Sequence, residues 1–400
     1  MALSFPTSYD ILVVGLGAMG SAALYQLAKR GQRVLGLDRF HPPHQQGSSH
    51  GDTRITRQSV AEGACYMPLV QRANELWRAI EVDSGEELLV RNGLLLLEGS
   101  TGGGSIHGQM GFVTRTMALA QEHGIDHEVL DAAAMGQRFP PFRLRGDEVG
   151  YFEPGAGFLR PERCIAAQLA LAERHGAEVR GGEAVIEFGA DARGEGVVVS
   201  TPGGSYRAGR LGIATGAWIK PLLPAALWDR AQVYRQVLHW FPVADVAPFE
   251  ARGFPTFLWV YGDGDEDFFY GFPALDGPGG GIKLATETFQ HPIVDPQNRE
   301  QQVDPAEAQD FFQRRIAGRL AHVEKGCLRS VSCMYTMLPE ARFFIDEHPD
   351  YPQVTLVSPC SGHGFKHSAA LGEAIAQRLV AESSQLDLSP FALKAFGATP

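Results

Sequence analysis

The chain has 400 residues, of which 44% are hydrophobic and 20% are charged, and its formal net charge is -11. This length and composition exclude a disordered or fibrous chain and predict a globular protein with two domains. The acidic charge excludes nucleic acid as an expected partner, because a negative surface repels the phosphate backbone.

The apolar runs and the cysteines argue against a membrane-spanning, a disulfide-stabilised and a metal-binding protein. The first apolar run, 11–14, opens a strand, and no stretch reaches the roughly 18 apolar residues of a membrane span. We therefore expect a cytoplasmic protein without membrane contact. The five cysteines are odd in number and form no C-x-x-C pair, and no H-E-x-x-H spacing occurs. The sequence thus predicts neither a disulfide framework nor a metal site.

The first forty residues have the pattern of a dinucleotide-binding unit. An apolar strand over 9–14 runs into a G-x-G-x-x-G motif, a helix is expected over 21–30, and a strand over 33–37 ends at Asp38. The motif glycines are Gly15, Gly17 and Gly20. They suit a tight turn, approach of the backbone to a diphosphate, and helix–strand packing, while the acid suits a ribose hydroxyl. The motif alone does not separate FAD from NAD.

Apolar periodicity predicts the elements that follow. Helices are expected over 67–80, 114–123 and 163–175, strands over 177–188 and 210–215, and a Gly/Ser-rich surface loop over 99–108. Between about 221 and 320, aromatic strand-like runs over 233–241, 254–261 and 268–272 predict a separate antiparallel sheet, followed by a helix over 305–317. A strand over 354–358, a glycine turn and a helix over 368–381 end the pattern.

Because a strand, a glycine turn and a helix occur near both ends, we expect both ends to build one nucleotide-binding domain. The predicted class is α/β with two domains, a Rossmann-like domain with an inserted antiparallel-sheet substrate domain. The predicted ranges are 1–85, 145–220 and 321–400 for the nucleotide-binding domain, and 86–144 and 221–320 for the substrate domain.

Four blocks after Asp38 carry a family resemblance. They are Gly51-Asp52-Thr53-Arg54-Ile55-Thr56-Arg57, Gly281-Ile282-Lys283-Leu284, Cys333-Met334-Tyr335-Thr336 and Ser361-Gly362-His363-Gly364-Phe365-Lys366. In this order, and over nearly the whole chain, they resemble the family of monomeric sarcosine oxidase and N-methyltryptophan oxidase, FAD-dependent amine oxidases of the D-amino acid oxidase group. The resemblance implies that the Rossmann-like domain is an FAD-binding domain.

The resemblance also implies roles near the flavin. Cys333 is similar to the cysteine that carries FAD in a thioether, although a buried core cysteine is the commoner case. Lys283 is similar to the lysine that activates oxygen, since an ammonium would stabilise the charge on reduced oxygen. Arg54 and His50 match residues along the flavin faces, where positive charge would tune the potential. The other cysteines match no such block and are expected in the core or on the surface.

The substrate would be held by residues of the same blocks. Arg57 and Lys366 match the pair of cations that binds the substrate carboxylate. Tyr270 and Tyr335 match walls of the substrate cavity. Glu287 departs from the family, which usually has a histidine there. An acid suits a substrate with a cationic or hydrogen-bonding group, and the alternative is that Glu287 turns outward into a surface pair.

A second departure is Val60, which stands where sarcosine oxidase has a tyrosine. The two departures put sarcosine itself in doubt as the substrate. The cofactor residues implied by the resemblance are Gly15, Gly17, Gly20, Asp38, Arg39, Ser48, Thr53, Cys333, Gly362, His363, Gly364, Phe365 and Lys366.

The implied activity is oxidation of a secondary (N-methyl or cyclic) amino acid by a monomer. A hydride passes from the carbon next to nitrogen to covalent FAD, the imine hydrolyses, and O2 reoxidises the flavin to give H2O2. The alternatives are another FAD-dependent amino acid oxidase or dehydrogenase of the deglycating or D-amino acid type, an NAD-dependent dehydrogenase, or a flavin-binding protein without catalysis.

Overall fold

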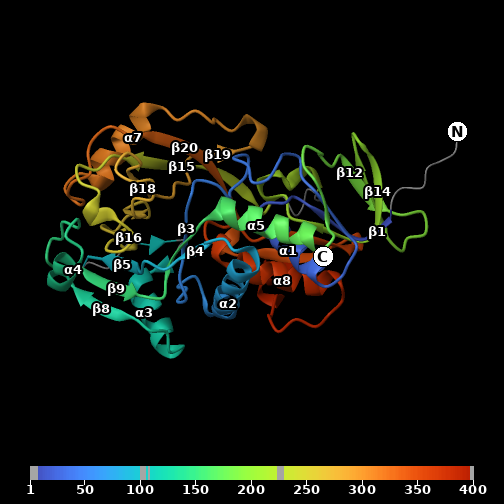
Figure 1. Ribbon diagram of the computed structural model, residues 1–400, viewed down its shortest axis with the longest axis horizontal. Coiled ribbons are helices and arrows are strands. Elements are labelled where there is room, and N and C mark those ends of the chain that lie inside the picture. Colours follow the sequence, from blue (N-terminus) through green and yellow to red (C-terminus); the bar gives the residue numbers. More distant parts are fainter. Residues whose placement is uncertain (1–7, 100–104, 107–108, 223–228, 397–400) are drawn as a thin grey trace.

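The computed structural model describes residues 8–99, 105–106, 109–222 and 229–396. Two large sheets, one of eight strands and one of nine, contain most of the strands of the described chain. They lie towards opposite ends of an elongated molecule, and helices α1, α2, α5 and α8 gather beside the eight-stranded sheet (Figure 1). The predicted α/β class is confirmed.

The eight-stranded sheet has a parallel centre in the order β11-β2-β1-β14, with β22 also parallel to β14. Antiparallel strands β13 and β12 extend it beyond β14, and β21 pairs with β22. The bounds are β1 Ser8–Val14, β2 Val34–Leu37, β11 Glu178–Arg180, β12 Glu187–Ala190, β13 Val197–Thr201, β14 Gly204–Ile213, β21 Phe344–His348 and β22 Tyr351–Ser358.

One strand prediction is wrong. The stretch 177–188 forms two strands, β11 and β12, at opposite edges of this sheet. The reason lies at Gly181 and Gly182, since Gly182 has φ 75°, a left-handed conformation that interrupts a strand. Strand β14 also begins six residues before the predicted start.

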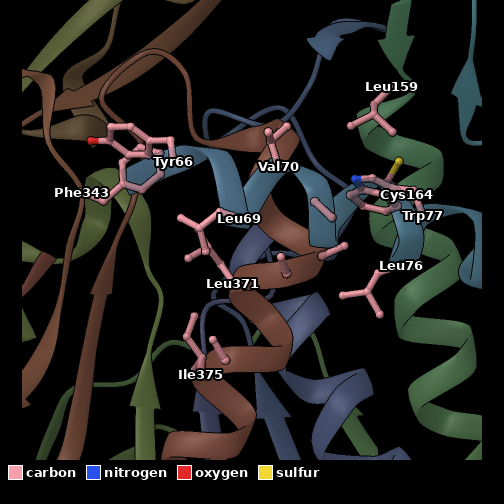
Figure 2. Close-up of a cluster of buried hydrophobic side chains, with 14 of the residues drawn as sticks. Tyr66, Leu69, Val70, Leu76, Trp77, Leu159, Cys164, Phe343, Leu371 and Ile375 are labelled. Carbon is pink, nitrogen blue, oxygen red and sulfur yellow. The ribbon is translucent and has the colours of Figure 1, made fainter. Parts of the chain in front are cut away.

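Four helices pack together beside this sheet. They are α1 Ala18–Lys29, α2 Met67–Ser84, α5 Pro161–Arg174 and α8 Ser368–Leu379, so the four helices predicted there exist with shifted ends. Helix α8 packs against α1 so closely that a Cβ on Gly372 would lie 2.4 Å from the Cβ of Ala22. Leu371 and Ile375 of α8 face Leu69 of α2 in the same buried cluster (Figure 2). The two ends of the chain therefore share one core.

The nine-stranded sheet has the order β19-β15-β18-β17-β16-β5-β9-β8, with β20 paired to β15. Its bounds are β5 Leu94–Glu98, β8 Glu128–Asp131, β9 Val149–Glu153, β15 Gln232–Phe241, β16 Thr256–Val260, β17 Phe268–Gly271, β18 Ile282–Ala285, β19 Pro292–Ile293 and β20 Arg329–Met337. Within the described residues the pairings are antiparallel, as predicted, except that β5 and β16 run parallel. The domain ranges stay a prediction. Strands β9 and β20 lie in the ranges predicted for the nucleotide-binding domain, yet they pair in this sheet.

A small antiparallel sheet joins the two parts through β3 Arg54–Thr56, β10 Gly157–Leu159 and β4 Leu89–Val90. The remaining elements are β6 Ser105–Ile106, β7 Gln109–Met110, α3 Phe112–Glu122, α4 Ala132–Arg138 and α7 Pro305–Phe311, which continues into a π-helix over Phe312–Ile316. Most of the predicted loop over 99–108 lies outside the described residues. None of the helices in the described ranges is long and apolar enough to cross a membrane.

Candidate active site

A cavity of about 430 Å³ lies at the carboxyl ends of the parallel strands. It joins the turn after β1 to the turn after β22, that is, Gly15 and Gly17 to Gly362 and Gly364. Ligands of open α/β sheets bind at this edge, and the volume is typical of ligand sites. The two ends of the chain thus build one cleft.

The glycines of the first turn fit a bound diphosphate. Gly15 has φ 86°, and a Cβ there would lie 2.6 Å from the carbonyl oxygen of Ala214. A Cβ on Gly20 would lie 1.7 Å from the carbonyl oxygen of Gly15, so this position allows no side chain. Gly17 lines the cavity, and its Cβ would meet no atom within 4 Å. The backbone is therefore open to a ligand at Gly17, directly before the N-terminus of α1.

The acidic and aromatic groups at the other end of the cleft suit a nucleoside. The carboxylate of Asp38 accepts hydrogen bonds from the backbone N–H groups of Leu16 at 2.7 Å and Phe40 at 2.8 Å, which leaves lone pairs for a ribose hydroxyl. Arg39 lies 4.6 Å above the Trp218 ring, and Phe40 packs edge-on against that ring. Phe40 and Trp218 were not predicted, because only the fold brings them beside the motif.

A second cavity of about 80 Å³ adjoins the cleft. Arg54, Tyr335, Gly362 and Phe365 line both cavities. The predicted residues that line the small cavity are Thr53, Arg54, Arg57, Tyr270, Lys283, Glu287, Tyr335, Gly362, His363, Phe365 and Lys366. Strands and turns far apart in the sequence therefore bring together all the predicted substrate residues.

Lys283 is a buried lysine of β18 whose Nζ contacts three oxygen atoms. Its Nζ donates to the carbonyl oxygen of Gly51 at 2.6 Å, to that of Thr53 at 2.9 Å and to Thr53 Oγ1 at 2.9 Å. Burial lowers the pKa of Lys283 well below its ordinary value, and the positive charge of Arg54 lowers this pKa further. The three acceptors match the three donors of an ammonium.

Two cations converge on one carboxylate that was not predicted. Arg57 Nη2 donates to both carboxylate oxygens of Glu62 at 2.7 Å, and Lys366 Nζ lies 3.9 Å from Glu62 Oε1. Lys366 Nζ also donates to the carbonyl oxygen of His363 at 2.7 Å. Burial lowers the pKa of Lys366 to about 8. The two cations therefore share a carboxylate of the chain itself, that of Glu62. The acid five residues after Arg57 was a signal that could have been noticed.

Arg54 links the cleft to Cys333. Its guanidinium donates to the carbonyl oxygens of Thr53 and Ser48 at 2.7 Å, and Nη2 lies 3.6 Å from Cys333 Sγ. Cys333 is buried on β20 and is 1% exposed. Cys360, which was expected in the core or on the surface, is partly buried and lines the cleft.

The positive charge predicted for His50 stays a prediction, and the protein around the ring does not favour it. Burial and the charge of Arg54 lower the pKa of His50 to about 3, so the imidazole is neutral near pH 7. Neither ring nitrogen has a hydrogen-bond partner within the described part of the chain. Among the described residues, His50 and Cys333 also lie outside the linings of both cavities.

The polar wall of the small cavity is formed by Glu287 and two tyrosines. Glu287 is 6% exposed and lines this cavity, so the alternative of an outward surface pair is wrong. Tyr270 and Tyr335 share a hydrogen bond, and burial raises the pKa of Tyr270 to about 12. Val60 is fully buried in the hydrophobic core.

The glycine turn before α8 is anchored by His363. The Nε2 atom of His363 lies 2.9 Å from the carbonyl oxygen of Ala341, and its ring stacks on Phe343 with centroids 4.6 Å apart. These contacts hold the turn at the junction of the two cavities. In the described residues no group of three or more His, Cys, Asp or Glu side chains gathers as a metal site.

The nucleotide cleft with an adjoining polar chamber defines the class of a dinucleotide-dependent oxidoreductase. Residues 10–378 match the model of the family "FAD dependent oxidoreductase", and the chain belongs to this family. This membership confirms the predicted FAD-binding fold and FAD as the cofactor, and it sets aside the NAD-dependent alternative.

The relatives show the same family over the full length. Monomeric sarcosine oxidase of Streptomyces avermitilis is 36% identical over 98% of this chain and 99% of its own. N-methyl-L-tryptophan oxidase of Salmonella dublin is 34% identical over 97% of this chain and 99% of its own. The structure of NikD, an unusual amino acid oxidase essential for nikkomycin biosynthesis, superposes with a TM-score of 0.81 at 25% identity, covering 96% of this chain and 97% of that one. The predicted resemblance is confirmed.

Proposed function

We propose that this protein is a flavin-dependent oxidase of a secondary amino acid, N-methyl or cyclic, with O2 as the electron acceptor. The observation that carries the proposal is that Arg57 and Lys366 both line one small cavity, on either side of the Glu62 carboxylate, beside a cleft that fits FAD. When bound, FAD accepts the hydride from the carbon next to nitrogen and returns two electrons to O2, which leaves as H2O2. The imine product then hydrolyses in water.

The chain's own residues would bind and orient the substrate. Arg57 and Lys366 hold the carboxylate, which fixes the oxidisable carbon relative to the junction of the two cavities. Glu287 accepts hydrogen bonds from the amine or from a cationic side group. Lys283 supplies a buried positive charge where negative charge develops on oxygen.

The cofactor residues would be those of the cleft. Gly15, Gly17 and the N-terminus of α1 hold the diphosphate, and Asp38 holds a ribose. We propose that Cys333 carries the cofactor in a thioether, supported by Arg54, which lines the cleft and whose guanidinium lies beside the sulfur.

The direct test is an anaerobic titration of the purified yellow protein with a panel of secondary amino acids. We expect the flavin absorbance to be bleached, and peroxide to form in equal amount when air is admitted. Bound FAD that no amino acid reduces would overturn the proposal. Bleaching by fructosyl or D-amino acids alone would favour the deglycating or D-amino acid alternatives, and bleaching without peroxide in air would indicate a dehydrogenase.

The thioether gives a simple prediction. Acid precipitation of the wild-type protein should give a yellow pellet, and Cys333→Ala should give a colourless pellet with FAD in the supernatant. Cys360→Ala is the matched control, because this thiol lines the cleft, and it should keep the pellet yellow. A colourless Cys360→Ala pellet would instead place the link at Cys360.

Glu287 should set substrate preference. Glu287→Gln keeps the shape and removes the charge, so kcat/KM for substrates with a second cationic group should fall about 10-fold relative to that for apolar N-methyl amino acids, a typical loss for a hydrogen bond to a charged group. The ratio of kcat/KM between the two substrate sets measures the effect. An unchanged ranking across the panel would contradict this role.

Lys366 gives a pH prediction. Its pKa is lowered to about 8, so the ammonium is present below that pH and is lost above it. The dissociation constant of propionate, a carboxylate without an amine, should therefore rise above pH 8. The flavin difference spectrum measures this binding. Lys366→Arg stays charged throughout and should remove the dependence. A flat wild-type profile from pH 7 to 10 would exclude Lys366 from carboxylate binding.

A further inference from the structure

Strand β3 lies between the two halves of the proposed chemistry. Gly51 and Thr53, which accept hydrogen bonds from Lys283, come directly before it, and Arg57 comes directly after it. The strand has three residues, and its ladder to β10 pairs only those three. Such a short ladder does not by itself fix the chain on either side, so other contacts must hold the two ends.

The first end is held by Glu162, at the start of α5. Its Oε1 accepts from the backbone N–H of Gly51 at 2.5 Å and of Asp52 at 3.2 Å. The Asp52 N–H and the Gly51 carbonyl belong to one peptide group, and Lys283 Nζ donates to that carbonyl at 2.6 Å. A carboxylate and an ammonium thus bind opposite ends of the same peptide, and each strengthens the other's hydrogen bond.

This first end adopts a backbone that needs support. Gly51 and Asp52 have φ values of 92° and 69°, in the left-handed region that a non-glycine residue rarely adopts. The contact with Glu162 offsets the free-energy cost of this backbone conformation. The turn then directs the Gly51 and Thr53 carbonyls at Lys283. Loss of Glu162 should let the turn relax and move the Lys283 ammonium.

The second end is held by Glu153, at the end of β9. This carboxylate is fully buried, accepts from the backbone N–H of Gln58 at 2.7 Å and of Ser59 at 3.3 Å, and accepts from the Tyr151 hydroxyl at 2.8 Å. The Gln58 N–H belongs to the peptide that begins at the Arg57 carbonyl. Glu153 therefore fixes the backbone from which the Arg57 side chain enters the small cavity.

The order of the elements along the chain explains why these two acids meet these two ends. Strands β3 and β10 are antiparallel, with Arg54 opposite Leu159 and Thr56 opposite Gly157. Glu162 follows the end of β10 that lies beside Arg54, and Glu153 precedes the end that lies beside Thr56. The short strand β10 thus separates two acids, each of which contacts the backbone at one end of β3.

We propose that Glu162 and Glu153 are positioning residues that hold opposite ends of β3, so that Glu162 fixes Lys283 for the reaction with oxygen and Glu153 fixes Arg57 for carboxylate binding. This proposal rests on the proposed function for the roles of the two cations. Neither acid is proposed to contact the cofactor or the substrate. Each acid is expected to affect a different half-reaction.

The kinetic test uses the holoenzyme and compares two alanine variants. Glu162→Ala should slow reoxidation by O2 about 10- to 100-fold and leave the dissociation constant of propionate within about twofold. Glu153→Ala should raise the dissociation constant of propionate about 10- to 100-fold. It should change KM more than kcat and leave the rate of reoxidation unchanged. Glu162→Gln and Glu153→Gln keep an acceptor oxygen and should recover part of each loss. Glu173→Gln changes an exposed acid of α5 and is the matched control.

A second measurement does not depend on activity. Hydrogen–deuterium exchange of the holoenzyme should become faster at 51–53 in Glu162→Ala and at 58–60 in Glu153→Ala, each without change at the other end. Unchanged exchange, or equal slowing of both half-reactions by either variant, would overturn the proposal. If each end opens as expected but the wild type oxidises no amino acid, the proposed function fails while the holding of β3 stands.

Discussion

Lys283→Met should slow the reaction of the reduced enzyme with O2 by about 100- to 1000-fold, the usual cost of removing a preorganised group that stabilises developing negative charge. Reduction by substrate should change less than twofold, because Arg57 and Lys366, the residues proposed to bind the carboxylate, lie elsewhere in the lining of the small cavity. The side chain of methionine has a similar length and is apolar. The substitution leaves three buried acceptor oxygens of Gly51 and Thr53 without this donor, so it should also lower the free energy of unfolding, which thermal unfolding of the variant measures.

Stopped-flow measurement of the two half-reactions separates these effects. The rate of flavin bleaching by substrate without oxygen reports reduction, and the return of absorbance on mixing with O2 reports reoxidation. Lys325→Met, at an exposed position, is the control for loss of a lysine. Equal slowing of the two half-reactions in Lys283→Met would rule out a specific role with oxygen.

The dinucleotide unit could be predicted because its determinants are local. The turn conformation of Gly15, the missing side chain at Gly20 and the helix that follows all lie within a few residues of each other. The family blocks were informative for a similar reason, since each keeps a short spacing. The split between β11 and β12 was missed because two glycines within an apolar run do not show by themselves that the next strand joins the far edge of the sheet.

The contacts between distant blocks could not be predicted from the sequence. Glu62 lies near Arg57 in the sequence, but it reaches Lys366 only because the turn before α8 folds against β3. Glu153 and Glu162 meet the ends of β3 only because β10 pairs with that strand. The neutral state of His50 results from burial that a local pattern does not report. The residue types were thus predictable, whereas their ionisation and partners depended on the tertiary structure.

The second large effect concerns Arg57 and Glu62, whose variants should change carboxylate binding in opposite directions. Arg57→Met removes a buried guanidinium from the carboxylate position, which should cost about 3 kcal/mol in binding, or about 100-fold in the dissociation constant of propionate. Glu62→Gln removes the anion that lies 2.7 Å from Arg57 and competes with the ligand. Propionate should therefore bind more tightly to Glu62→Gln at pH 7, as measured by titration of the flavin spectrum.

The pH profile of Glu62→Gln makes this prediction sharper. The negative charge of Glu62 raises the pKa of Lys366 against the lowering by burial, so removing this charge should move the loss of the ammonium below pH 8. At pH 7 the variant should thus bind propionate more tightly than the wild type does. As the pH rises, binding to the variant should weaken at a lower pH than binding to the wild type. If Glu62→Gln weakens propionate binding as much as Arg57→Met does, Glu62 orients Arg57 and does not compete with the substrate. That result would require the carboxylate to bind with the Arg57–Glu62 ion pair intact.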